Sequence, residues 1–471
     1  MKFTTEKSVK ICTSCRRVRK GIRMLTKDKS FYKQFFSLYW VLVLHNIIVL
    51  AVNLADNIMI GSYSEVSLSG VASVNQIQFV FQQIIMGCGD ALVMVGSQYW
   101  GQKRTGEIQK ISSAAMLLGA TTGLILFGAA ALFPESLLHI FTPSDAIVIE
   151  GVKYIEIIKY TYILFAVTNI LLATLRTVET VKIGFYISLC TLVINCTLNY
   201  LLIGGNFGAP EMGVRGAAIG TLTARAVETV VVLLYVLFKD NKLNINFSSY
   251  FTGDKKLFAD YYKSAWSVVL VAAMFGVSTA LQTVVLGHMT DSAIAANSVS
   301  TSLYQTLKVA MIGASAATAV IIGKTVGSGD MAKLKEYTKT AQVIFLCIGL
   351  VTSTLLFILR IPILQFYDLS PETKEMANAF ILILCITGFG TAYEMPTLTG
   401  IVRGGGDAKF ILKNDIISIW CIVLPLSFLA AFQWNWSPVA VVFCLNFDQL
   451  FKCIPAFIKV NRYTWIKKLT G

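Results

Sequence analysis

Three polar residues within apolar stretches of this sequence have the types and spacing needed to hold an ion. Asp56 lies near the end of the first long apolar run, and Asn195 and Asn199 lie four positions apart in a later run. Residues four apart share one face of a helix, so the two amides can act on one ligand. Carboxylate and amide oxygens can coordinate a cation, and the same amides can hydrogen-bond a protonated carboxyl. A purely structural role for the asparagines, as hydrogen-bonding links between helices, fits the sequence equally well.

An ionisable group inside an apolar run is costly, which makes each one a candidate for function. Asp56 meets this description, and its alternative role is that of an interfacial carboxylate that caps a neighbouring helix. Asp90 lies near two glycines in the second apolar run and could line the same cavity. Glu394 precedes Pro396, and a proline can kink a helix beside a site. We therefore expect Asp56 to bind the ion, and Asp90 and Glu394 to be further carboxylates of the cavity or of the second half.

The other chemistry-bearing residues do not indicate an enzyme. Arg225 and Glu228 lie three positions apart, so they can share a helical face, and we expect a structural ion pair. The three histidines are far apart, and the zincin, Walker and Gly-x-Ser-x-Gly motifs are missing. We expect no cofactor and no resident metal, although a transported sodium ion could bind at Asp56. Without a nucleotide motif, energy must come from an ion gradient or from the substrate's own gradient.

The elements that position these residues are predicted to be membrane helices. The 471 residues are 55% hydrophobic and only 14% charged, whereas soluble domains carry about 25% charge. The mean hydropathy is +0.67. A spanning helix needs about 20 mostly apolar residues. About twelve such runs occur, at 36–60, 71–98, 111–133, 153–175, 183–203, 214–238, 264–287, 296–323, 338–361, 376–400, 410–432 and 437–458.

The placement of charge predicts the orientation of these spans. The net charge of +14 is concentrated in the two termini and in the loops after even-numbered spans, whereas loops after odd-numbered spans hold acids and one basic residue, Lys374. The positive-inside rule then places both termini in the cytoplasm. The first 35 residues carry eleven basic residues and two acids, which favours contact with an anionic lipid leaflet over a specific partner such as nucleic acid.

Cysteines give no sign of a disulfide framework. Most of the ten lie within the apolar runs, where they act as small apolar residues. Cys12 and Cys15 form one CxxC in the basic tail, but a zinc knuckle needs a second pair of ligands, and none is nearby.

The chain is an internal duplication with one informative asymmetry. Gly101 recurs as Gly327 after 226 positions, and its surroundings recur with it, but Asp56 falls on Gln282. We expect the glycines of the two matching turns, Gly101 in the first and Gly327 and Gly329 in the second, to end their helices in a left-handed cap. Each half has six spans, so the two repeats have the same orientation in the membrane. We expect the repeats to be related by an axis along the membrane normal, with the substrate path between them.

This duplication predicts five parts of the chain. They are a basic cytoplasmic tail (1–35), a first lobe (36–238), a cytoplasmic linker (239–263), a second lobe (264–460) and a cytoplasmic C-terminal tail (461–471). The fold class is therefore an all-α integral membrane protein of twelve transmembrane helices in two six-helix lobes.

Four segments, in chain order, resemble the multidrug and toxic compound extrusion (MATE) family. They are Ala55-Asp56-Asn57-Ile58-Met59-Ile60-Gly61, Gln98-Tyr99-Trp100-Gly101, the stretch 208–218, and Arg403-Gly404-Gly405-Gly406-Asp407. The likeness runs from about residue 36 to 460. It implies two lobes in a V shape, alternating access, and export of organic cations in exchange for sodium or protons.

The resemblance also implies roles for single residues. Asp56 matches the family's first-span acid, and Asn195 and Asn199 match the branch with asparagine at both fifth-span positions. That branch also uses a seventh-span glutamate and a tenth-span aspartate. The seventh span here has no acid at 272–276, and Glu394 is only near the tenth-span position.

We therefore predict a secondary antiporter in the cytoplasmic membrane of a bacterium. It would act as a monomer in the lipid bilayer and exchange small organic cations for sodium or protons at Asp56. The alternative is a flippase for lipid-linked precursors, which would favour a large basic cavity. An intramembrane enzyme or receptor fits the internal duplication less well.

Overall fold

The computed structural model describes residues 25–245, 254–367 and 369–470, and these form an all-α membrane protein. Eleven helices in this part of the chain are long and apolar enough to cross a membrane, and one further pair, α6 and α7, is bent by 52° and makes a twelfth span. The twelve expected spans are therefore confirmed, with the fourth as a broken helix. The basic tail with Cys12 and Cys15 lies outside the described residues.

The helices of the first lobe follow one another between Lys29 and Phe238. They are α2 (Lys29–Tyr63), α3 (Glu65–Gly101), α4 (Thr105–Leu132), α5 (Pro134–His139), α6 (Asp145–Ile158), α7 (Thr161–Thr177), α8 (Lys182–Ile203), η1 (Asn206–Gly208) and α9 (Val214–Phe238).

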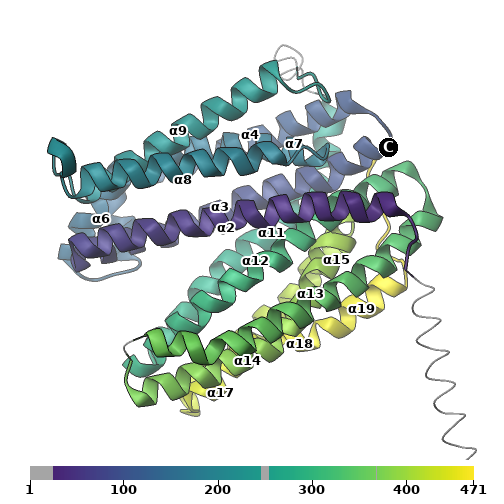
Figure 1. The fold of residues 1–471 in the computed structure, drawn as a ribbon. Helices are drawn as coiled ribbons and strands as arrows, with labels where there is room; N and C mark the ends of the chain where they lie inside the picture. The colour runs from purple at the N-terminus through teal and green to yellow at the C-terminus, as the bar shows by residue number, and fades with distance from the viewer. Residues whose placement is uncertain (1–24, 246–253, 368, 471) are drawn as a thin grey trace, which may run out of the picture.

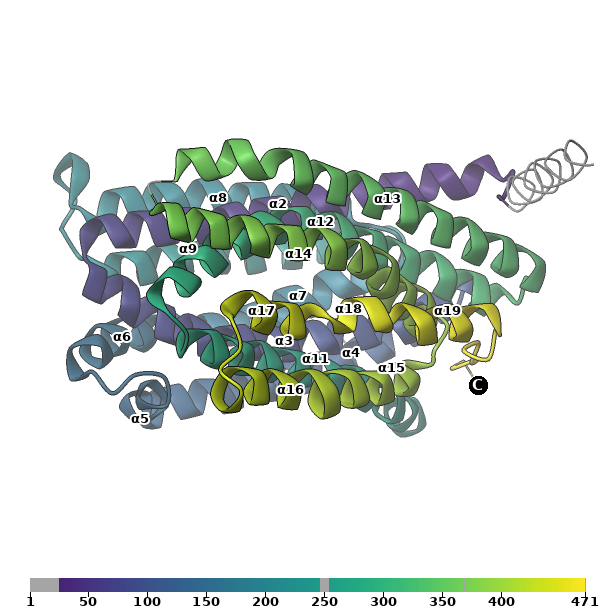
Figure 2. The same ribbon diagram turned by 90° about the horizontal axis from the view of Figure 1, so that it is seen from below.

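The helices of the second lobe begin at Lys255. They are α11 (Lys255–Gly287), α12 (Asp291–Ser328), α13 (Met331–Phe366), α14 (Pro371–Met395), η2 (Pro396–Val402), α15 (Ala408–Asp415), η3 (Ile416–Val423), α16 (Leu424–Phe428), η4 (Leu429–Gln433), α17 (Pro438–Asn446), α18 (Asp448–Phe451) and α19 (Cys453–Asn461). Figure 2 shows α17, α18 and α19 in one line beside α14, so these three short helices together make the last span.

Side-chain hydroxyl groups bond to the backbone where one helix ends and the next begins. Ser64 has an extended backbone that ends α2, and its hydroxyl accepts a hydrogen bond from the backbone N–H of Ser67 in the first turn of α3. At the bend between α6 and α7, the Thr161 hydroxyl donates to the carbonyl of Ile158 over 2.6 Å. That bond satisfies a carbonyl that the broken helix leaves free.

The two lobes are joined at one end of the molecule. Among the described residues, one hydrophobic core runs through both lobes there, from Phe31 of α2 to Val326 of α12 and Trp465 after α19. Toward the opposite end each lobe has its own core, around Tyr162 in the first and Phe380 in the second. Figure 1 shows the two bundles diverging from the end that carries the C-terminus. The arrangement is a V of two lobes.

The repeated glycines lie where the lobes approach most closely. A Cβ on Gly101 of α3 would collide with the carbonyl oxygen of Lys324, and a Cβ on Gly327 of α12 would collide with that of Gln98. Residues 98 and 324 are also 226 positions apart, so the contact is reciprocal about the axis that relates the repeats.

The expected left-handed cap is present at Gly329, which ends α12 with a φ of 77°. It is wrong at Gly101 and Gly327, and after α3 the positive φ occurs at Lys103 instead. The two repeated glycines are needed for backbone approach between the lobes rather than for helix ends.

The helix irregularity expected at Pro396 is present. The α-helical pattern of α14 ends at Met395, and the span continues as a π-helical segment from Pro396 to Val402. Proline lacks the backbone N–H that a regular turn requires. The Thr399 hydroxyl donates to the Met395 carbonyl over 2.7 Å, within this irregular turn. Such segments are common at functional sites, and Glu394 lies immediately before it.

Candidate functional site

Asp56 lies on α2, in the half of the first lobe away from the joined end. The Nδ2 atom of Asn199 on α8 donates to Asp56 Oδ1 over 2.6 Å. Asn195, one turn earlier on α8, is also within hydrogen-bonding reach of the carboxylate. Asn195 and Asn199 are both fully buried, with 1% and 0% of their surfaces exposed. The structure thus brings together the three residues that the sequence singled out first.

The helix α9 completes this site. Asn195 Nδ2 donates to the Thr221 hydroxyl over 3.2 Å, and the Nδ2 atom of Asn199 also lies 3.4 Å from Asn195 Oδ1. A Cβ on Gly220 would collide with Asn199 Oδ1, so glycine is needed for the amide to fit between α8 and α9. Asn199 Oδ1 is buried and accepts no hydrogen bond among the described residues. The site therefore holds an unused amide oxygen beside a carboxylate.

The nearest cation to this site is already paired. Arg225 NH1 lies 2.7 Å from Glu228 Oε2, so the expected ion pair is present. The Arg225 guanidinium lies over the Phe165 ring, 5.2 Å from its centroid. Arg225 and the buried Tyr154 both interact electrostatically with Asp56. Because Glu228 neutralises Arg225, the Asp56 carboxylate has hydrogen bonds but no ion-pair partner within the described residues.

Asp90 lies far from Asp56. Asp56 is 8 residues before the turn at Ser64 and Asp90 is 26 residues after it, so the two carboxylates differ in depth by about 27 Å at 1.5 Å per helical residue. The structure thus places Asp90 at the joined end of the lobes and not in a cavity shared with Asp56.

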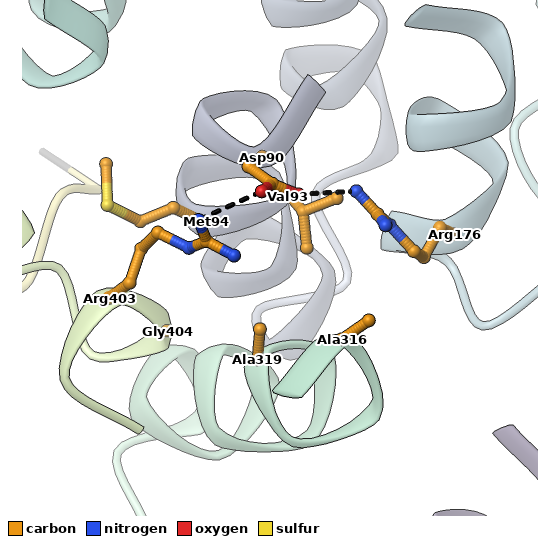
Figure 3. A pocket seen from close by; sticks show the side chains of 8 residues that line it. All are labelled: Asp90, Val93, Met94, Arg176, Ala316, Ala319, Arg403 and Gly404. Atoms are coloured by element: carbon orange, nitrogen blue, oxygen red, sulfur yellow. Dashed lines mark hydrogen bonds and ion pairs between the residues drawn. The ribbon is translucent and has the colours of Figure 1, made fainter. Parts of the chain in front are cut away.

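Two arginines flank Asp90, one from each lobe (Figure 3). Arg176 at the end of α7 lies 2.8 Å from Asp90 Oδ1, and Arg403 of the second lobe lies 2.9 Å from Oδ2. A cavity of about 10 Å³ lies between them, lined also by Ala316 and Gly404. Arg176 and Arg403 occupy matching places in the two repeats, whereas Asp90 matches Ala316. The Asp90 carboxylate therefore pairs with one arginine from each lobe.

Glu394 is buried in the second lobe near the end of α14, with 8% of its surface exposed. It shares no contact with Asp56 in the described part of the chain.

Similarity to known proteins covers both lobes. The MatE family model matches residues 42–201 and 266–429, which is more than half of the chain and gives one block in each repeat. The chain belongs to the MATE family. The resemblance seen in the sequence is confirmed, and the protein is a member of a family of membrane transporters.

Bacterial MATE relatives match along most of their length. The uncharacterized transporter YisQ of Bacillus subtilis is 22% identical, over 94% of this chain and 96% of its own. A protein of Thermotoga maritima named "Probable multidrug resistance protein NorM" is 23% identical, over 81% of this chain and 82% of its own.

Solved transporter structures share the fold. A variant of the Vibrio cholerae MATE transporter VcmN superposes with a TM-score of 0.84 at 16% identity, covering 93% of this chain and 98% of its own. A transporter of Pyrococcus furiosus, described as having a binding pocket of reverse polarity, gives a TM-score of 0.82 at 16% identity, covering 94% and 97%. The fold expected from the sequence, twelve helices in two lobes, is therefore confirmed.

Three residues of the site, Thr221, Gly220 and Tyr154, were not predicted from the sequence. One sequence pattern could have predicted Gly220 and Thr221. Gly216 and Gly220 are four positions apart in an apolar run, a spacing of small residues that indicates close packing between membrane helices. Because α8 precedes α9 in the chain, that packing would bring Thr221 to the asparagines. No comparable signal exists for Tyr154.

Proposed function

We propose that this MATE protein is a secondary antiporter that exports small organic cations from a bacterial cell in exchange for sodium ions or protons. It works as a monomer in the cytoplasmic membrane, with both termini in the cytoplasm. The observation that carries the proposal is the half-buried Asp56 carboxylate, bonded to the buried amide of Asn199, whose oxygen accepts no hydrogen bond among the described residues. Such a set of oxygens suits the reversible binding of one cation or proton.

The coupling follows from the charge of Asp56. An ionised carboxylate in this apolar surrounding attracts a cationic substrate, and binding of a proton or a sodium ion removes that attraction. The Asn199 amide can donate to the ionised carboxylate. After a half-turn about its terminal bond, it can instead present its oxygen to a bound sodium ion or to a protonated carboxyl. Substrate and ion therefore exclude each other at one site.

Alternating access uses the joint between the lobes. With the termini in the cytoplasm, the structure is the outward-facing form, since the lobes are joined at the cytoplasmic end. The ion pair between Asp90 and Arg403 crosses the two lobes there. An ion or substrate shifts the balance of the two forms only by its different affinity for each of them.

The relatives support export over the alternatives. The name of the Thermotoga maritima relative refers to multidrug resistance, and that description suits a transporter of small organic molecules. A flippase for lipid-linked precursors would favour a basic site, whereas the first-lobe site here is built on one carboxylate and a neutralised arginine.

Transport by the purified protein in proteoliposomes tests the proposal. Efflux of a fluorescent organic cation is measured under a sodium gradient and, separately, under a proton gradient. We expect one gradient to drive efflux in the wild type and not in Asp56→Asn. Glu65→Gln, which changes an exposed carboxylate at the start of α3, is the matched control and keeps full activity. Folded wild-type protein that moves no organic cation under either gradient would contradict the proposal.

A further inference from the structure

A short segment follows the last span and lies at the joined end of the lobes. We call its residues 465–470 the C-terminal strap. Trp465 is fully buried, and its indole N–H donates to the Val460 carbonyl over 2.9 Å. The backbone N–H of Lys467 donates to the Gly405 carbonyl over 2.8 Å, and the Lys467 ammonium forms an ion pair with Asp407. The strap is thus attached to the second lobe.

Two glycines of the segment 403–407 make room for the strap. A Cβ on Gly405 would collide with the Trp465 ring. A Cβ on Gly406, whose φ is +99°, would collide with the Lys467 carbonyl oxygen. The segment 403–407 stands out in the sequence, but the Asp56 site does not use it. Its glycines are explained by the strap that packs against them.

Three hydrogen bonds join the strap to the first lobe within the described part of the chain. Gln98 Nε2 donates to the Lys467 carbonyl over 3.0 Å, and Gln98 Oε1 accepts from the backbone N–H of Leu469 over 2.8 Å. The fully buried Gln98 amide therefore pairs with the strap as the backbone of a neighbouring strand would. Gln102 Nε2, at the end of α3, donates to the Thr470 hydroxyl over 2.6 Å.

The corresponding segment of the first repeat, residues 239–245, is bonded to its own lobe. The Leu243 carbonyl accepts from Gln109 Nε2 of α4 over 2.6 Å, and Lys242 Nζ donates to the Val178 carbonyl over 2.6 Å. Both partners belong to the first lobe. The crossing of the strap from one lobe to the other is therefore not a consequence of the internal duplication.

The two attachments of the strap differ in strength. The second lobe holds it by an ion pair, a backbone hydrogen bond and a buried tryptophan. The first lobe holds it by hydrogen bonds between neutral groups. Hydrogen bonds between charged groups are about twice as strong as neutral ones, and a buried aromatic ring adds apolar area removed from water. Separation of the lobes at this end would therefore break the bonds to Gln98 and Gln102 and leave the strap on the second lobe.

We propose that the C-terminal strap is a regulatory element that holds the joined end closed through Gln98 and Gln102, and that its release from the first lobe accompanies the opening of that end. The opening itself rests on the alternating access proposed above. Loss of two neutral hydrogen bonds should change the ratio of the open and closed forms about tenfold.

Distances between spin labels on Gly106→Cys and Ala332→Cys, in an otherwise cysteine-free protein in bilayers, test the proposal. These exposed positions match in the two repeats and lie in the first turns of α4 and α13. Two changes release the strap from opposite sides. Deletion of residues 468–471 keeps Trp465 and Lys467, and Gln98→Leu removes the amide of the first lobe.

We expect each change to raise the proportion of the longer distance relative to the shorter one about tenfold. The combined variant should show less than the product of the two effects, because both changes remove the bond between Gln98 and Leu469. Lys468→Ala, which removes an exposed side chain and keeps the backbone of the strap, is the control and leaves the distances unchanged. Thermal unfolding shows that each variant is folded.

Unchanged distances in both the deletion and Gln98→Leu would overturn the role of the strap. Asp90→Asn then shows what else has failed. If it opens the joined end, only the strap is wrong, and if it does not, alternating access at this end is wrong as well. Independent, multiplicative effects in the combined variant would also overturn the proposal. If the distances change as expected but efflux fails, the antiport is at fault and the strap stands.

Discussion

Among single residues, Asn199 decides how the Asp56 carboxylate is held. The amide is buried, donates to the carboxylate over 2.6 Å and fits only because position 220 is glycine. Removal of a group that supports a bound ion commonly weakens ion affinity about ten- to a hundredfold. Loss of the Asn199 amide should therefore raise the ion concentration needed for half-maximal transport. It should change the maximal transport rate less.

We predict that Asn199→Ala raises the ion concentration for half-maximal efflux about ten- to a hundredfold. The measurement is efflux from proteoliposomes as the coupling ion is varied. Asn206→Ala, in the turn after α8, removes an amide that donates to the Tyr200 carbonyl and not to Asp56; it is the control and leaves this value unchanged. An unchanged half-maximal concentration in Asn199→Ala would show that the amide only links helices.

The sequence predicted the polar residues of the first-lobe site because apolar surroundings make such residues conspicuous. Asp56, Asn195 and Asn199 come together as their positions in two apolar runs indicated. The partners of Asp90 could not be predicted in this way. Arg403 is 313 positions away in the other repeat, and only the packing of the two lobes brings it to the carboxylate.

At the scale of elements, the segment after α19 is fastened to both lobes. Lys467 Nζ lies 2.6 Å from Asp407 Oδ1, and Lys459 lies 2.7 Å from Oδ2. Gln98 of the first lobe donates to the Lys467 carbonyl over 3.0 Å and accepts from the backbone N–H of Leu469 over 2.8 Å. Burial alone would raise the pKa of Asp407, but the hydrogen bonds from the two lysines outweigh it, and the pKa lies below its ordinary value of 3.8.

This lowered pKa predicts the pH dependence of stability. A carboxyl whose pKa is lower in the folded state contributes stability that is complete above its unfolded pKa and is lost as pH falls through the folded pKa. We predict that Asp407→Asn lowers the free energy of unfolding by about 1–3 kcal/mol at neutral pH. The difference from the wild type should shrink below about pH 4. Thermal unfolding at several pH values measures it, and a difference that stays constant into acid would refute the role of Asp407.

The close approach of α3 and α12 makes a second prediction at this scale. Gly327→Val places side-chain atoms against the Gln98 carbonyl, and overpacking of this kind costs about 1–3 kcal/mol. Gly128→Val, at a helical glycine with open space around it, is the matched control. We expect a lower unfolding temperature only for Gly327→Val. Equal unfolding temperatures would mean that α3 and α12 can move apart at this contact without loss of stability.

The sequence located the helices well but not their irregularities. Apolar runs identify spans because a membrane helix needs an apolar surface along its whole length. The 52° bend between α6 and α7 was not predicted, since no glycine or proline lies at residues 159–160. The left-handed cap was predicted correctly at Gly329 but wrongly at Gly101 and Gly327. At those two positions glycine serves a contact between distant segments, which the local sequence does not show.

At the scale of the whole molecule, polar contacts between the lobes gather at one end. Asp90 bonds to Arg403, and Lys324 Nζ lies 2.5 Å from Glu179 Oε1. Before α2, the backbone N–H of Thr26 donates to the Thr340 hydroxyl of α13 over 2.9 Å. Together with the shared hydrophobic core, these contacts stabilise the form in which the lobes diverge at the opposite end.

We predict that Asp90→Asn shifts the protein toward the form that opens at the end where the lobes are now joined. A loss of about 1.4 kcal/mol changes the ratio of the two forms about tenfold. Distances between spin labels at the first turns of α4 and α13, which lie at the joined end, should gain a longer component in a cysteine-free background. Glu156→Gln, which removes an exposed ion pair within the first lobe, is the control. Identical distance distributions in the wild type and Asp90→Asn would show that this ion pair does not hold the lobes.

Ion and substrate are proposed to compete for the Asp56 carboxylate, and equilibrium binding to the purified protein measures this competition without transport. Binding of a fluorescent organic cation is followed by anisotropy as sodium is added, and separately as the pH is lowered from neutral. We predict that one of the two ions weakens binding to the wild type, and that Asp56→Asn binds more weakly without responding to that ion. An ion response of the same size in Asp56→Asn would contradict the account.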